Sequence, residues 1–83
     1  MEMIWIKTEE MLENLRNEPG VEQQYALSLG GILRSTHWLI YDAERGLYGD
    51  SMDWEEYAWY TREEFLEVRG GQLVVPGALN RMK

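Results

Sequence analysis

Four carboxylates lie close together in the middle of this chain: Asp50, Asp53, Glu55 and Glu56. Paired carboxylates can act as a general acid and a general base, or they can hold a hard cation such as calcium. Nothing in the neighbouring sequence marks one of these groups as desolvated and another as exposed. The segment also lacks the D-x-D-x-D-G spacing of an EF-hand calcium loop. Catalysis and metal binding therefore remain minor alternatives.

The only histidine, His37, offers little further support for catalysis. It stands in an apolar segment, where we expect a half-buried histidine bonded to backbone or to a neighbouring side chain. The chain contains no cysteine and no serine in a G-x-S-x-G elbow, so a hydrolase triad has no basis. The glycine pairs at 30–31 and 70–71 match neither a P-loop nor a G-x-G-x-x-G turn. We predict a protein that is not an enzyme and uses no cofactor or metal.

The distribution of charge is the most informative feature of the sequence. Residues 42–67 contain nine acids and two bases, so this segment carries the whole formal net charge of −7. The same segment holds six of the ten aromatic residues. Tyrosine and tryptophan are favoured at protein contacts because they bury a large area at low entropic cost. We predict that a basic protein partner binds through Asp50, Asp53, Trp54, Glu55, Glu56, Tyr57, Trp59 and Tyr60.

Carboxylates spaced along a chain can imitate a line of phosphates. They would pair with arginine and lysine in a nucleic-acid-binding groove, and their field would speed the encounter with a basic target. In size, charge and composition the chain resembles small phage-encoded inhibitors of bacterial defence, such as anti-CRISPR and anti-restriction proteins. It is similar in the same respects to bacterial immunity proteins, which cap nuclease toxins. The resemblance includes no shared motif, so no residue role is carried over.

These observations predict a non-enzymatic inhibitor that occludes a nucleic-acid-binding surface of its target. The alternatives are a self-associating structural or assembly protein and an immunity-type toxin neutraliser. The segment also has a purely structural interpretation, in which its aromatic residues form the core and its acids form a solvated rim. This interpretation has weight because the chain contains a single phenylalanine, so tryptophan and tyrosine must fill core positions.

The net negative charge also limits the class of partner and the location. Membrane surfaces and nucleic acid phosphates would repel the chain, so we expect direct binding to neither. No apolar stretch approaches the roughly 20 residues that span a bilayer, and the first residues do not form a signal peptide. The lack of cysteine fits a reducing compartment. We expect a cytoplasmic protein.

The elements that position these residues should form one small α+β domain over residues 1–83, with a frayed tail at 78–83. We expect a mainly antiparallel sheet of about four strands with two or three short helices. One sheet face would then be closed by a partner or a second copy, so a homodimer is an alternative. The strands are predicted at 3–7, 36–42, 47–49, 54–60 and 72–75, with the strand at 36–42 central and covered on both faces.

Local signals define the predicted helices. Thr8 is expected to cap a first helix that ends at residues 17–20. Apolar residues from Val21 to Leu33 recur at helical spacing and predict a second helix, which the glycines at 30–31 either interrupt or end. Thr61 and Glu64 match a capping box that opens a short third helix, and the glycines at 70–71 close it.

Overall fold

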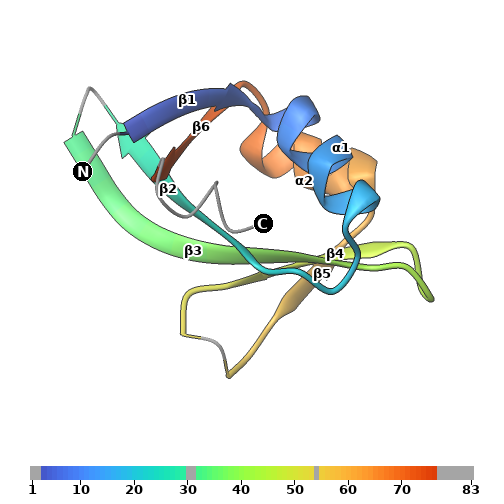
Figure 1. Cartoon of the computed structure of the whole chain (residues 1–83). Coiled ribbons are helices and arrows are strands. Elements are labelled where there is room, and N and C mark those ends of the chain that lie inside the picture. The colour runs from blue at the N-terminus through green and yellow to red at the C-terminus, as the bar shows by residue number, and fades with distance from the viewer. Residues whose placement is uncertain (1–2, 30–31, 54, 77–83) are drawn as a thin grey trace.

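The computed structural model describes residues 3–29, 32–53 and 55–76. Within these ranges the chain forms an α+β fold with a six-stranded antiparallel sheet, in the order β1-β6-β2-β3-β4-β5, and two helices (Figure 1). The predicted fold class is confirmed, but the sheet has six strands rather than about four. Neither described helix is long and apolar enough to cross a membrane. The elements are β1 (Met3–Lys7), α1 (Thr8–Asn17), β2 (Gln23–Leu29), β3 (Ile32–Asp42), β4 (Leu47–Ser51), β5 (Ala58–Tyr60), α2 (Arg62–Arg69) and β6 (Gln72–Pro76).

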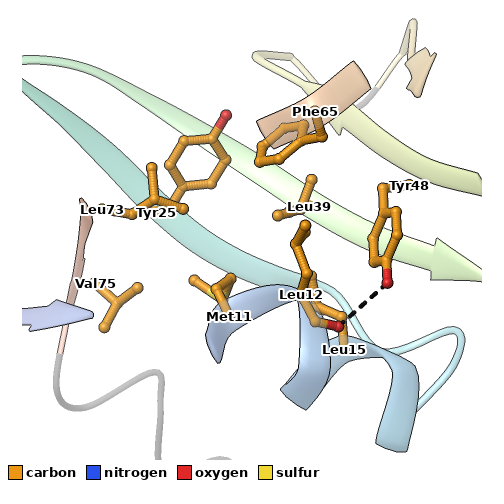
Figure 2. Close-up of a cluster of buried hydrophobic side chains, with 9 residues drawn as sticks. All are labelled: Met11, Leu12, Leu15, Tyr25, Leu39, Tyr48, Phe65, Leu73 and Val75. Atoms are coloured by element: carbon orange, nitrogen blue, oxygen red, sulfur yellow. Dashed lines mark hydrogen bonds between the residues drawn. The ribbon is translucent and has the colours of Figure 1, made fainter. Parts of the chain in front are cut away.

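Both helices lie on one side of the sheet. Figure 1 shows the long strand β3 curving beneath α1 and α2, which lie together inside the curve of the sheet. The apolar side chains of both helices meet those of the strands there and form a single core (Figure 2). That core consists of Met11, Leu12, Leu15, Tyr25, Leu39, Tyr48, Phe65, Leu73 and Val75. The helix side of the sheet is therefore the interior of the protein.

The predicted helix over 21–33 is wrong, and this error accounts for β2, the one strand that the predicted ranges lack. The chain instead forms β2, which pairs antiparallel with β3. The spacing of Val21, Tyr25 and Leu29 is four residues, which places side chains on one face of a helix and equally on one face of a strand. Tyr25 lies opposite His37 in the register and is fully buried. The glycines at 30–31, predicted to interrupt or end that helix, lie outside the described residues.

Several local predictions are confirmed. Helix α1 ends at Asn17, within the predicted range. The sequence of residues 42–46 also predicts a turn in which Gly46 suits a positive φ, and Gly46 has a φ of 71°. Helix α2 begins with the predicted capping box, in which Thr61 accepts from the backbone N–H of Glu64 and the Glu64 carboxylate accepts from the N–H of Thr61. Strand β6 ends at Pro76. In each case a turn or cap residue determines the boundary from nearby sequence alone.

Thr8 does not cap α1 as predicted. The N-cap is Lys7, and Thr8 is a buried first residue of the helix. Its hydroxyl donates to the carbonyl oxygen of Arg69 at 2.6 Å, and its backbone N–H donates to the carbonyl of Gly71 at 3.0 Å. Thr8 therefore joins the start of α1 to the junction between α2 and β6, a long-range role that the local pattern did not indicate.

The strand predicted over 54–60 is shorter than expected, and β3 is not covered by helices on both faces. Within the described part of this segment only Ala58–Tyr60 form a strand, β5, whereas the backbone N–H groups of Glu55 and Glu56 donate to the Asp53 side chain. In β3, His37 and Leu39 are buried on the helix side, whereas Trp38 and Ile40 on the other face remain partly exposed. Residues of this other face form the candidate site.

Candidate functional site

The face of the sheet opposite the helices carries a second group of aromatic side chains. The register places Ile40, Gly49 and Trp59 directly side by side across β3, β4 and β5. Because side chains alternate along a strand, and their neighbours Leu39 and Tyr48 enter the core, these three positions face outward. We call this region the Trp59 surface, and it consists of Pro19, Gly20, Glu22, Ile40, Asp42, Ala43, Arg45, Tyr57 and Trp59.

Gly49 makes room for the two aromatic rings of this surface. A Cβ atom at this position would lie 2.7 Å from Cζ3 of Trp59 and 3.0 Å from Cδ2 of Tyr57. The two rings stack with centroids 5.7 Å apart and planes inclined by 29°. A glycine inside a strand commonly marks such a close approach. The sheet is thus built to hold Trp59 against it while leaving that side chain 37% exposed.

An arginine lies over the Trp59 ring. The Cζ atom of Arg45 is 4.2 Å from the ring centroid, which is a cation–π distance. The Nε–H of Arg45 donates to Oδ2 of Asp42 at 2.7 Å, and Oδ1 of Asp42 accepts from the backbone N–H groups of Glu44 and Arg45. The pKa of Asp42 is lowered, mainly by the side-chain hydrogen bond from Arg45 and to a smaller extent by these two backbone hydrogen bonds. The turn between β3 and β4 therefore carries an ionised carboxylate and a positioned guanidinium.

An open groove of about 370 Å³ lies beside Trp59. Its walls come from the loop after α1, the end of β3 and the exposed indole ring. The backbone N–H of Gly20 donates to the carbonyl of Tyr41 at 3.1 Å and so holds the loop against the strand. The lining residues are Pro19, Gly20, Ile40, Tyr41, Asp42, Ala43 and Trp59, a mostly apolar set with one carboxylate.

Tyr57 connects the surface to the segment before β2. Its hydroxyl donates to Oε2 of Glu22 at 2.5 Å. This hydrogen bond, together with desolvation and the negative charge of Glu22, raises the pKa of Tyr57 to about 12. The Tyr57 hydroxyl is therefore protonated at neutral pH and donates to the Glu22 carboxylate. This hydrogen bond holds the Tyr57 ring in its position against Trp59.

Asp53 organises the loop that precedes β5. Its Oδ1 atom accepts from the backbone N–H groups of Glu55 at 3.0 Å and Glu56 at 3.2 Å, and from the Ser51 hydroxyl at 3.2 Å. These bonds, the one from Glu55 first, lower the pKa of Asp53. The side chains of Glu55 and Glu56 are exposed. By binding this backbone, Asp53 holds the loop that exposes the carboxylates of Glu55 and Glu56 immediately before Tyr57.

Asp50 lies in the interior rather than on this surface. It pairs with Leu39 in the register, faces the helices and is only 8% exposed. Its Oδ2 accepts from the hydroxyl of Tyr25 at 2.8 Å, and its Oδ1 lies 3.0 Å from Nδ1 of His37. Burial, with the charge of Asp50 second, raises the pKa of Tyr25. We call these three residues the inner network and leave Asp50 out of the candidate surface.

The other predicted site residues divide in the same way. Tyr60 turns toward the core, where its ring contacts Phe65 edge-on with centroids 5.7 Å apart. Trp54 lies outside the described residues. The structure brings five predicted residues to the outer side or its adjoining loop, namely Asp53, Glu55, Glu56, Tyr57 and Trp59.

Sequence reasoning missed the contribution of Glu22, Arg45 and the groove. The spacing of Asp42 and Arg45 is a recognisable turn signal, and a glycine within a strand indicates close packing. Nothing local connects Glu22 with Tyr57. Among the described residues, no group of three or more histidine or acidic side chains is arranged to hold a metal ion. The arrangement is suited to binding cationic side chains through carboxylates and aromatic faces.

A scan of protein-family models, a search of curated proteins and a search of solved structures each found no match.

Proposed function

We propose that this chain is a non-enzymatic binding protein that occludes a basic, nucleic-acid-binding surface of a protein target, in the manner of small phage inhibitors of bacterial defence. The observation that supports this proposal is the combination of stacked, partly exposed rings and solvent-facing carboxylates on the side of the sheet that the helices leave open. Trp59 and Tyr57 supply contact area, and the exposed side chains of Glu55 and Glu56 supply charge in the loop that leads to them.

The two kinds of side chain would contribute differently to binding. Aromatic rings at the centre of an interface are desolvated on contact and often dominate the binding energy. Exposed carboxylates at the rim accelerate encounter with a basic target and select against acidic ones. Because Asp53 already fixes the loop that carries Glu55 and Glu56, little conformational entropy is lost when that loop is bound.

Affinity capture from a bacterial lysate tests this proposal. The wild-type chain should retain a basic nucleic-acid-binding protein at low salt and release it at high salt, since exposed charge pairs are screened. A Glu55→Lys/Glu56→Lys variant should fail to retain it. The matched control is Glu10→Lys/Glu13→Lys, which reverses two exposed charges on α1, and this variant should retain the target.

Both variants should remain folded, because surface substitutions usually change stability by about 0.5 kcal/mol or less. Urea unfolding of each variant checks this expectation. Equal retention of the target by both variants would contradict the proposal, because binding would then be independent of the Glu55 and Glu56 carboxylates.

Self-association is a second candidate function, and a different region supports it. Strand β1 is an edge of the sheet, and its residues Ile4 and Trp5 are 38% and 54% exposed. An exposed apolar edge strand can pair with a second copy of itself. Light scattering of the wild-type chain tests this candidate, and a monomer at all working concentrations would eliminate it. An immunity-type neutraliser would use the same chemistry as the leading proposal and would differ in capturing a nuclease toxin.

A further inference from the structure

We propose that the groove beside Trp59 binds an arginine side chain of the basic partner, and that Arg45 occupies the guanidinium position of this site when no partner is bound. The inference rests on the proposed function and names the chemical group that the site recognises. Arg45 would then compete with the partner's arginine for the position over Trp59, and the partner would displace it.

The position of Arg45 shows that a guanidinium fits against this surface. One carboxylate oxygen of Asp42 lies 2.7 Å from Nε, and the Trp59 ring lies 4.2 Å from Cζ. A planar, weakly hydrated guanidinium suits such a site, since it stacks on an aromatic face while it donates hydrogen bonds in its own plane. The more strongly hydrated ammonium of lysine does not stack in this way.

The contact made by Arg45 should be easily displaced. Its side chain is 50% exposed and that of Asp42 is 28% exposed, and exposed ion pairs of this kind contribute little to stability. A partner arginine would meet the same ring and carboxylate, while Arg45 could turn into solvent at little cost. The exchange replaces one guanidinium with another and leaves the fold unchanged.

The groove offers apolar walls for the methylene stem of an arginine side chain. Pro19, Ile40 and Ala43 form apolar walls against which a methylene stem can pack, and Asp42 lies among the lining residues. The volume of about 370 Å³ lies within the range of ligand pockets, about 300–1,000 Å³. The carboxylate of Glu22, which accepts from the hydroxyl of Tyr57 beside Trp59, complements a positive charge at this end of the sheet.

Removing this competing side chain should therefore raise affinity. An Arg45→Ala variant vacates the position over Trp59, but it also makes the chain more negative. The matched control is Arg62→Ala, which removes the same charge from the first turn of α2, where Arg62 lies 3.7 Å from Glu9. Any gain that is specific to the groove appears as the difference between these two variants.

The test is calorimetric titration of the full chain at low salt with two probes, nona-arginine and nona-lysine peptides. We expect the Arg45→Ala variant to bind nona-arginine about fivefold more tightly than the Arg62→Ala variant. We expect the two variants to bind nona-lysine equally. A Trp59→Leu variant, which removes the ring but not the carboxylates, should lose the preference for nona-arginine, and its NMR spectrum should report a folded protein.

Equal affinities of the Arg45→Ala and Arg62→Ala variants for nona-arginine would overturn the inference, as would an equal gain for nona-lysine or the absence of binding to either peptide. The proposed function can survive the failure of this inference. If Glu55→Lys/Glu56→Lys still weakens peptide binding while the two arginine variants behave alike, the acidic surface binds cations but the groove does not select arginine.

Discussion

Asp50 and Asp53 stand three positions apart in the chain and have opposite environments. Asp50 faces the helices, where Tyr25 and His37 surround its carboxylate in the inner network. Asp53 faces solvent and binds the backbone of its own loop. One acidic segment thus serves both sides of the sheet, and its charge cannot be assigned to one role.

The comparison extends to the aromatic residues. Tyr60 enters the core against Phe65, whereas its neighbour Trp59 lies on the outer face with Arg45 over its ring. In the interior group Phe65 is fully buried and Tyr60 is partly buried against the core, so both contribute to stability. The outer group is partly exposed and is available to a partner. Substitutions on the two sides should therefore separate loss of folding from loss of binding.

Asp50→Ala should have the largest effect on stability. It removes the acceptor that the Tyr25 hydroxyl and Nδ1 of His37 share within the core. Taking away the hydrogen-bond partner of a buried polar group costs about 1–3 kcal/mol, and this substitution takes a partner from two such groups. Urea unfolding should show this loss, and Asp53→Ala should show a much smaller one. If Asp53→Ala proved as destabilising as Asp50→Ala, the distinction between the inner network and the outer loop would be lost.

Gly49→Ala should disturb the outer face selectively. The added methyl group would overlap the rings of Trp59 and Tyr57, and overpacking of this kind typically costs about 1–3 kcal/mol. We expect the indole N–H resonance of Trp59 to shift while resonances of Leu39 and Phe65 in the core stay in place. Unchanged Trp59 resonances and unchanged target binding would show that the close approach at Gly49 does not position the rings.

The smallest expected effect is a change in titration on the outer face. Glu22→Gln should return the pKa of Tyr57 from about 12 toward its ordinary value of 10.0, because it weakens the hydrogen bond that holds the phenol proton and removes the negative charge that opposes ionisation. A raised folded-state pKa means that this contact stabilises the fold fully below pH 10.0 and that its contribution is lost as the pH rises through about 12. Carbon NMR of labelled tyrosine side chains would measure both values. A Tyr57 pKa near 10.0 in the wild-type chain would contradict the bond to Glu22.

Features encoded by neighbouring residues could be predicted from the sequence. The capping box of Thr61 and Glu64 and the glycine turn at Gly46 each depend on a few consecutive positions. The apolar spacing of Val21 and Tyr25 was misleading because it satisfies both helical and strand periodicity. The insertion of β6 between β1 and β2 pairs segments far apart in the chain, and no local pattern encodes it.

The candidate site could be predicted only in part for a similar reason. The composition of residues 42–67 indicated a surface rich in acids and aromatics. Which face each strand residue takes depends on where the helices pack, so the sequence alone does not show that Asp50 and Tyr60 turn toward the interior. The bond between Glu22 and Tyr57 joins positions 35 residues apart, and only the folded chain brings them together.

Competition with nucleic acid tests the central claim most directly. The captured target is loaded with labelled nucleic acid, and release is followed as the wild-type chain or the Glu10→Lys/Glu13→Lys control is added. We predict that both displace the nucleic acid, and that Glu55→Lys/Glu56→Lys requires at least about tenfold higher concentration. Displacement by the Glu55→Lys/Glu56→Lys variant at the wild-type concentration, or a ternary complex that retains the nucleic acid, would contradict the account.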